Sequence, residues 1–128
     1  MPELAVTDYP ASKRFWCGLV GFSVEYERPE EGFGYLVLGG AHVMLDQIDA
    51  GRTWATEPPL GRGINLEVQV ADLDAARRRI RDAQWPVFVE TEEKWYRAGG
   101  IEIGVRQFLV QDPDGYLLRL QQEIGERP

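Results

Sequence analysis

The sequence predicts an α+β fold built from two βαβββ modules. The chain of 128 residues repeats one pattern at an offset of 64, because VTDYPASKRFW, from Val6, matches VADLDAARRRI, from Val70. In each copy a strand ends in valine, an aspartate follows, and a helix begins after it. Strand signals then follow each helix, so each half reads as one strand, one helix and three strands.

Both helices have recognisable ends. Asp8 and Asp72 are expected to be N-caps, because their carboxylates can accept hydrogen bonds from free amides of the first turn. Pro10 suits the first helical position, and Gly21 is expected to end the first helix. Apolar residues at three- and four-residue steps predict the buried faces, namely Ala11, Phe15 and Leu19, then Leu73, Ala76, Ile80 and Ala83. The second helix has a predicted solvated face of four arginines, Arg77, Arg78, Arg79 and Arg81.

The strands are predicted from apolar runs and turn residues. In the first half they are 22–28, 35–38 and 41–48, with a tight turn at Gly39–Gly40. In the second half they are 64–70, 86–89, 105–111 and 116–122, with the turn DPDG at 112–115. Residues 90–104 are expected to form a longer loop or irregular strand, in which KWYR can pair at an edge. One domain is expected, with modules at 1–48 and 64–128 and a linker at 49–63.

Composition restricts the classes of function. The 14 basic and 21 acidic residues give a net charge of −7, which disfavours nucleic acid and mildly favours a cationic ligand. The sequence has no apolar run of membrane-spanning length, and we expect no secretory leader. A single cysteine, Cys17, excludes an internal disulfide framework and fits a reducing compartment. We therefore expect a cytoplasmic protein with no nucleic-acid or membrane partner.

Three segments carry a resemblance to a known family. FWCGLVGFSVEY, LEVQVADLDAARRRI and FLVQDPDGYLLRLQQ resemble, at this spacing, segments of the vicinal-oxygen-chelate superfamily. That superfamily contains glyoxalase I, fosfomycin-resistance enzymes, ring-cleaving dioxygenases and bleomycin-resistance proteins. The resemblance covers nearly the whole chain. It implies that the two modules form an open, curled mixed sheet with a cleft, with helices outside, and usually a homodimer.

Alternation along the strands predicts which side chains line the implied cleft. In segment 64–70 the apolar residues alternate with Asn65, Glu67 and Gln69, so one face should lie under a helix and the other should be open. By the same rule Leu117, Arg119 and Gln121 line the cleft from the last strand, and His42, Met44 and Asp46 line it from segment 41–48. Arg119 has two candidate roles: it pairs with Glu67 across the cavity, or it contacts a ligand.

The resemblance also indicates where a metal would bind. The positions that hold a divalent ion in the superfamily correspond here to Met1 or its neighbours, Met44, Gly63 and Arg119. A thioether, a glycine and a guanidinium do not chelate such an ion, and the only histidine, His42, stands alone. We therefore expect no metal or other cofactor. Cys17 is expected to be structural, and no residue is assigned a catalytic role.

The aromatic residues complete the functional prediction. Phe33, Tyr35, Trp54, Trp95 and Tyr96 lie on loops or short strands that can rim the cleft, and aromatic rings beside acidic groups suit a flat cationic ligand. The closest resemblance is to the bleomycin-resistance proteins, which sequester such a drug without a metal. Those proteins place a tryptophan just before the penultimate strand, where this chain has Gly104 or Val105, so Trp95 is the candidate replacement.

The prediction is therefore a metal-free homodimer that sequesters a bleomycin-type drug or a similar aromatic cation. The alternative is a metal-dependent lyase, isomerase or dioxygenase of the same superfamily, glyoxalase-like or dioxygenase-like, or an enzyme that uses Glu67 and Arg119. The predicted ligand-binding residues are Phe33, Tyr35, His42, Met44, Asp46, Trp54, Asn65, Glu67, Trp95, Tyr96 and Arg119.

Overall fold

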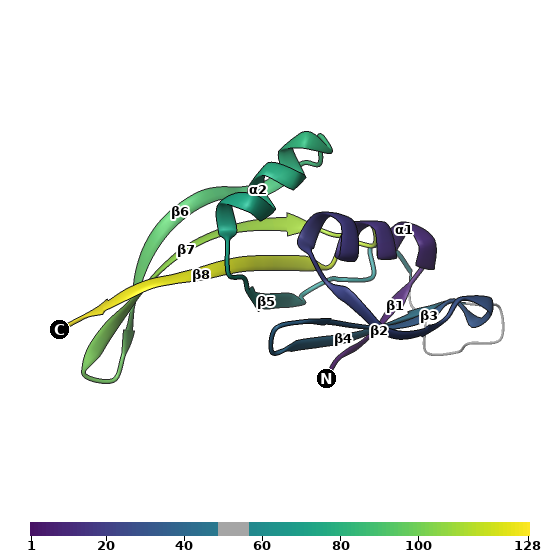
Figure 1. Ribbon diagram of the computed structural model, residues 1–128, viewed down its shortest axis with the longest axis horizontal. Coiled ribbons are helices and arrows are strands. Elements are labelled where there is room, and N and C mark those ends of the chain that lie inside the picture. Colours follow the sequence, from purple (N-terminus) through teal and green to yellow (C-terminus); the bar gives the residue numbers. More distant parts are fainter. Residues whose placement is uncertain (49–56) are drawn as a thin grey trace.

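The computed structural model describes residues 1–48 and 57–128 and contains two four-stranded mixed sheets with helices on one side of the strands (Figure 1). Sheet A is formed by the first half of the chain and sheet B by the second. Each half has the predicted order of one strand, one helical segment and three strands, so the α+β fold of two βαβββ modules is confirmed. No helix in the described ranges is long and apolar enough to cross a membrane.

Sheet A consists of β1 (Glu3–Val6), β2 (Ser23–Arg28), β3 (Phe33–Leu38) and β4 (Ala41–Gln47), in the order β1-β4-β3-β2. β1 is parallel to β4, and the other neighbours are antiparallel. A 3₁₀ turn, η2 (Pro29–Glu31), joins β2 to β3. The β3–β4 turn is the predicted glycine pair, and Gly39 has a φ of 57°, which favours glycine.

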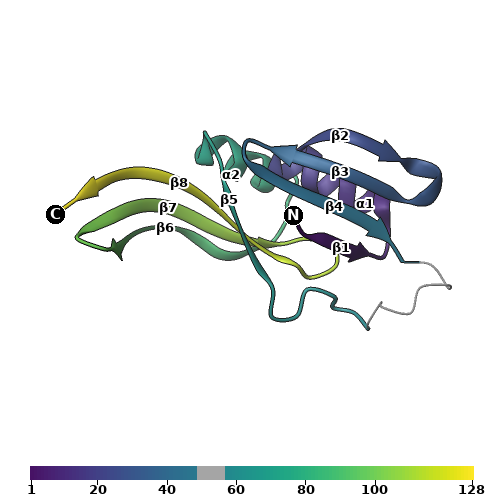
Figure 2. The same cartoon turned by 90° about the horizontal axis from the view of Figure 1, so that it is seen from below.

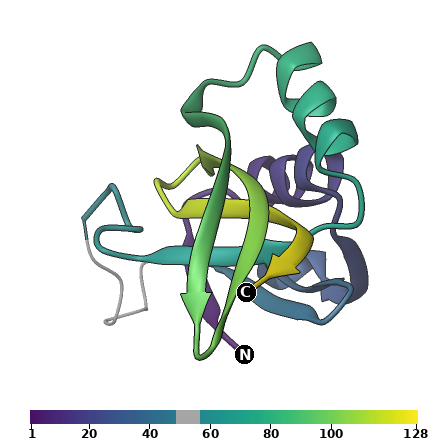
Figure 3. The same ribbon diagram turned by 90° about the vertical axis from the view of Figure 1, so that its left-hand side faces the viewer.

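Sheet B consists of β5 (Asn65–Gln69), β6 (Val87–Ala98), β7 (Ile101–Gln111) and β8 (Leu117–Arg127), in the order β5-β8-β7-β6. β5 is parallel to β8, which repeats the arrangement of β1 and β4. Of the two alternatives for residues 90–104, the irregular strand is confirmed and the loop is wrong. β6 and β7 pair as one long hairpin through a turn at Gly99–Gly100, and the pairing is irregular between Val87 and Glu92. The KWYR segment does pair at the sheet edge, as expected. The far ends of β6–β8 curve away from the helices, as Figures 1 and 3 show.

The first helical segment changes its geometry part-way. It begins as α1 (Tyr9–Lys13), capped by Asp8, and continues as a π-helix, η1 (Arg14–Val20), which ends at Gly21 in the left-handed region. Phe15 is buried as predicted. The wider π-turns shift the side chains around the axis, so that Trp16 and Val20 are buried in place of Leu19. Ala11 and Leu19 are only half-buried. The fully buried residues of the segment are Tyr9, Ser12, Phe15, Trp16 and Val20.

The second helix, α2 (Leu73–Asp82), follows the prediction more closely. Asp72 caps its first turn, and Leu73, Ala76 and Ile80 are buried. The prediction was wrong for Ala83, which is exposed because the helix ends there and Ala83 is its C-cap. Its arginines are not a uniformly solvated face, because Arg79 donates hydrogen bonds to the carbonyls of Leu19 and Val20. These carbonyls end the π-helix and lack helical partners, so Arg79 joins the two helical segments.

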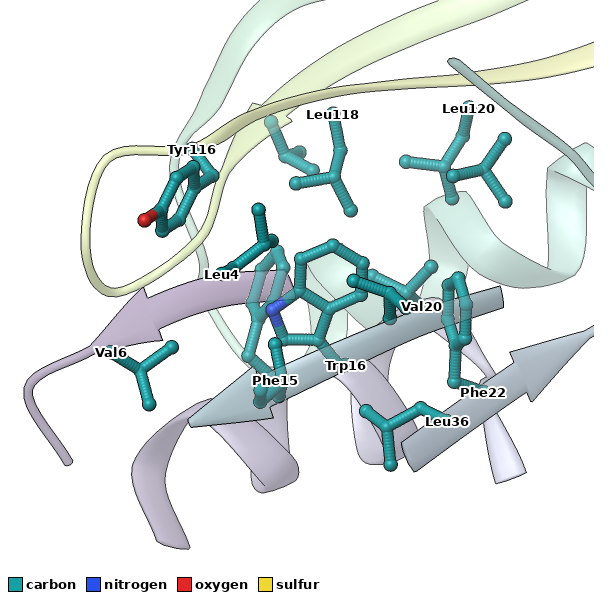
Figure 4. Packing of buried hydrophobic residues seen from close by; sticks show 14 of the residues in the cluster. Leu4, Val6, Phe15, Trp16, Val20, Phe22, Leu36, Tyr116, Leu118 and Leu120 are labelled. Atoms are coloured by element: carbon teal, nitrogen blue, oxygen red, sulfur yellow. The ribbon is translucent and has the colours of Figure 1, made fainter. Parts of the chain in front are cut away.

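The core lies where the helical segments meet both sheets. Figure 4 shows Phe15 and Trp16 between Leu118 and Leu120 of β8 and Leu36 of β3. All five side chains are buried, with exposed fractions of 2% or less. The helix-facing residues of the two sheets therefore share one core, and no helix from residues 1–48 or 57–128 lies over the opposite faces of the sheets.

The DPDG turn ties the second module to the first. The Asp112 carboxylate accepts hydrogen bonds from the Trp16 indole at 3.1 Å and from the backbone N–H groups of Asp114 and Tyr116. The Asp114 carboxylate accepts from the backbone and hydroxyl of Thr7, and the Tyr116 hydroxyl donates to the carbonyl of Ala5. Burial raises the pKa of Asp112 to about 6, although its three donors favour the ionised form. We call this set of contacts the inter-module clasp.

Candidate functional site

The face of sheet A without a helix carries five of the predicted residues. Leu36, Val43 and Leu45 point into the core, so the alternate positions of β3 and β4 lie on the other face. Those positions are Phe33, Tyr35, His42, Met44 and Asp46. Figure 2 views the strands from below, with α1 behind them, and so shows this face. The alternation in the sequence therefore placed these residues on one face correctly.

An aromatic cluster stands on this face. The rings of Tyr26 and Tyr35 are stacked, with centroids 5.3 Å apart and planes 17° apart, and the Tyr35 hydroxyl is hydrogen-bonded to Nδ1 of His42. Tyr26 is 52% exposed, so the stack is open to solvent. Phe33 is buried instead, with the Arg28 guanidinium 4.1 Å from its ring centre. We call Tyr26, Tyr35 and His42 the aromatic platform.

Tyr26 was not predicted from the sequence. The residue lies in β2 next to an irregularity in pairing between Val24 and Tyr26, which breaks the simple alternation of the strand. The irregularity sets Tyr26 directly opposite Tyr35 in the register. An exposed tyrosine in a charged segment, SVEYER, gives no sequence signal that distinguishes a platform residue from an ordinary surface residue.

The open face of sheet B contains a hollow of about 280 Å³. It joins three predicted residues, Glu67 from β5, Tyr96 from β6 and Arg119 from β8. Glu67 and Arg119 are direct partners in the parallel register of β5 and β8. The remaining lining of this sheet B hollow is apolar apart from one amide, and consists of Ala98, Ile103, Val105 and Gln121.

The structure favours one of the two roles considered for Arg119. No hydrogen bond or ion pair joins Arg119 to Glu67 or to any other residue in the described parts of the chain. The Arg119 Nε atom is buried and has no partner there. An unpaired buried donor is costly, since it has lost its water without gaining an acceptor. The guanidinium is therefore available to a ligand in the hollow.

A row of amide side chains crosses the same face, and it was not predicted. Gln69 donates to Gln121, Gln121 donates to Gln107, and Gln107 donates to the Tyr96 hydroxyl at 2.9 Å and to Glu92 at 3.2 Å. Gln107 and Gln121 are both buried. The row fixes the orientation of Tyr96 at the rim of the hollow. Isolated glutamines have no distinctive sequence pattern, so only the register of the strands brings them together.

The other predicted residues lie elsewhere. Asn65 lines a different hollow, together with Arg62 and Gly63. Trp95 lies on the face of β6 opposite Tyr96, flat against Gly104, with the Arg127 guanidinium 4.2 Å from its ring centre. The missing side chain of Gly104 is what admits the Trp95 ring. Trp54 lies outside the described residues.

The donor groups of the hollow do not fit a divalent metal ion. Glu67 offers one carboxylate, and the guanidinium of Arg119 brings a fixed positive charge beside it. Met44, the other side chain at a position comparable to a metal ligand, offers a thioether on sheet A. No group of three or more potential metal ligands occurs within residues 1–48 and 57–128.

The single thiol is also poorly suited to chemistry. Burial raises the pKa of Cys17, which makes the nucleophilic thiolate scarcer at neutral pH. The nearby carboxylate of Glu27 is engaged with the Tyr9 hydroxyl and with Lys13. These contacts support the structural role expected for Cys17.

Comparisons with known proteins identify the family. The Glyoxalase/Bleomycin resistance protein/Dioxygenase superfamily matches residues 2–120. The chain belongs to this superfamily. A superfamily member from Vibrio splendidus 12B01 is 36% identical, and the match covers 95% of each chain, with a TM-score of 0.44. No curated protein sequence matches the chain.

Other solved structures share the fold. TioX from Micromonospora sp. ML1 is 25% identical, with a TM-score of 0.71 and coverage of 97% of this chain and 98% of that one. A virulence protein from Salmonella typhimurium is 19% identical, with a TM-score of 0.70 and coverage of 96% and 94%. The superfamily contains both enzymes and binding proteins, so membership alone does not assign an activity.

Proposed function

We propose that this protein is a metal-free homodimer that binds and sequesters a flat, cationic small molecule in the manner of bleomycin-resistance proteins. The observation that carries the proposal is the solvent-exposed stack of Tyr26 on Tyr35, on a sheet face that no helix of the described structure covers. Stacked rings on a fixed strand pair offer a flat ligand a large contact area at little entropic cost. Binding by stacking needs no catalytic residue.

The charges on the open faces of the sheets favour a cationic ligand. Glu67 projects into the sheet B hollow without an ion pair in the described structure, and the whole chain carries an excess of acidic residues. A cationic group on the ligand gains from both, and it can also lie over the rings of the aromatic platform. Bleomycin and phleomycin, which combine a flat heteroaromatic tail with a cationic group, are suitable probes.

Removal of the Tyr35 ring should weaken binding without unfolding the protein. Stacking contributes roughly 0.5–1.5 kcal/mol beyond area burial, and a desolvated cation over the ring adds about 1–2 kcal/mol. Tyr35→Ala should therefore weaken the affinity for bleomycin on the order of tenfold, as measured by isothermal titration calorimetry. Tyr35→Phe keeps the ring and should stay close to the wild type.

The matched control is Phe88→Ala, which removes an exposed ring that lines a different hollow, beside Trp85 and Pro86. It should leave the affinity unchanged. If neither drug binds the wild type at micromolar concentration, the drug assignment fails. If Tyr35→Ala binds as tightly as Phe88→Ala, the stacking proposal fails.

The proposed dimer is expected from the surfaces that one chain leaves open. Both sheets end in unpaired edge strands, β1 and β2 in sheet A and β5 and β6 in sheet B. Large side chains also remain exposed on the edge strands β2 and β6, namely Tyr26 and Tyr96, and on the neighbouring strand β7, namely Ile101. A two-fold partner covers both features. Analytical ultracentrifugation at micromolar concentration should give twice 14.6 kDa, and a mass of 14.6 kDa would contradict the dimer.

A further inference from the structure

Arg119 has no hydrogen-bond acceptor in the described structure, although the carboxylate of Glu67 is on the neighbouring strand. Its Nε atom is buried and unpartnered, and Glu67, its direct neighbour in the strand register, makes no ion pair with it in the described structure. Arginine does not lose its proton in proteins, so the positive charge is permanent. An acceptor from outside the described chain is therefore the most direct way to satisfy the group.

The neighbouring polar groups are already engaged. The Gln121 amide, which also lines the hollow, accepts from Gln69 and donates to Gln107. Gln107 in turn donates to Tyr96 and Glu92. This row engages the amide of Gln121, which lines the hollow beside Arg119. Two charged groups without partners in the resolved structure, one negative and one positive, therefore remain in the hollow.

The two charges constrain the ligand together. Neighbouring strands lie about 4.8 Å apart, so a ligand group beside Arg119 is also close to Glu67. A simple anion is attracted by Arg119 but repelled by Glu67, and a simple cation meets the reverse. A ligand that carries both charges on neighbouring atoms is attracted by both residues.

We propose that the sheet B hollow recognises a zwitterionic head group, with a carboxylate toward Arg119 and an ammonium toward Glu67. A guanidinium matches the planar carboxylate, and the Glu67 carboxylate accepts from the ammonium. Ala98, Ile103, Val105 and the Tyr96 ring then contact the apolar body next to the head group. This inference rests on the proposed binding function, because it takes the open sheet face to be a ligand site.

Three small molecules of similar shape test the head group. L-phenylalanine carries both charges, phenylalaninamide lacks the carboxylate, and 3-phenylpropanoate lacks the amine. In NMR titrations at millimolar concentrations, phenylalanine should bind at least about fivefold more tightly than either analogue. The resonances of Arg119 Nε–H and of the Ile103 and Val105 methyl groups should shift with phenylalanine.

Charge-removing variants assign each preference to its residue. Arg119→Gln should abolish the advantage of phenylalanine over phenylalaninamide, and Glu67→Gln should abolish its advantage over 3-phenylpropanoate. Arg97→Gln, on the opposite face of β6, is the matched control and should retain both advantages. Glu67 is exposed, so Glu67→Gln tests the inference even if Arg119→Gln fails to fold.

Three results would overturn the inference: equal binding of the three probes, no binding of any probe, or unchanged ratios in Arg119→Gln and Glu67→Gln. A failure of the proposed function can be distinguished from a failure of this inference. If bleomycin binds the wild type and Arg119→Gln equally while the probes do not bind, the proposed binding function stands and the proposal of a zwitterionic head group is wrong. If phenylalanine binds as predicted and the drugs do not, the head group stands and the drug assignment is wrong.

Discussion

Replacement of Trp16 by alanine should lower the free energy of unfolding by about 3–5 kcal/mol. The side chain is 1% exposed, its ring contacts Phe22 edge-on with centroids 5.2 Å apart, and its indole N–H donates to Asp112. The substitution removes part of the shared core and one contact of the inter-module clasp together. Chemical denaturation, followed by circular dichroism, measures the loss.

Two further variants separate the contributions. Trp16→Phe keeps an aromatic ring but removes the donor to a buried carboxylate, which should cost about 1–3 kcal/mol. Trp95→Ala removes the same ring from the outer face of β6, where it is only half-buried, and should cost about 1 kcal/mol or less. Equal losses for Trp16→Ala and Trp95→Ala would contradict the packing described for Trp16.

Stability should fall as the pH rises from about 4 to about 6, because of Asp112. Burial raises the pKa of this carboxyl from 3.8 to about 6 in the folded protein, so over this interval the folded state holds a proton that the unfolded state has lost. The contribution is fully present below the unfolded pKa and is lost as the pH rises through the folded pKa. A shift of this size corresponds to about 3 kcal/mol. Urea denaturation at a series of pH values measures it.

Asp112→Asn provides the control, because an amide does not titrate. The nearby groups of the clasp are Asp114, the Tyr116 hydroxyl, whose pKa burial raises to about 12, and the non-titrating indole of Trp16. Subtraction of the variant curve from the wild-type curve should therefore leave a slope confined to pH 4–6. Identical slopes for the two proteins would show that Asp112 does not titrate in this range.

The repeated topology was predictable because short stretches of sequence determine the helix caps, the turns and the strand alternation. Asp8 and Asp72 cap the two helices as expected, and the glycine pair at 39–40 closes the predicted hairpin. Strict alternation also placed Glu67 and Arg119 on the open face of sheet B. These features depend on a few neighbouring residues or on a period of two, and both can be read without tertiary contacts.

Other features depend on long-range geometry. Residues 90–104 look like a loop because the far end of the β6–β7 hairpin is exposed on both faces, so its sequence has no apolar alternation. The π-helix changes which side chains face the core, and neither a proline nor a charged residue after Arg14 marks it in the sequence RFWCGLV. Trp95 and Tyr96 are adjacent in sequence but point to opposite faces, so only one of them reaches the hollow.

The site itself was partly predictable. The aromatic platform required the irregular pairing of β2, which brings Tyr26 opposite Tyr35. The unpaired state of Arg119 is accompanied by a row of three glutamines, which β5, β7 and β8 bring together. Neither the pairing irregularity nor the hydrogen bonding of those amides to one another can be predicted from residue type. The sequence therefore left two roles open for Arg119.

The most direct test of the binding proposal is to add bleomycin to protein stripped of metal with a chelator, isolate the complex and measure the mass of the recovered drug. We predict that the drug is bound without added metal, with at most one molecule on each open sheet face, and is recovered with its mass unchanged. Recovery of a chemically altered drug, or binding that appears only after a divalent metal is restored, would contradict it and favour an enzyme.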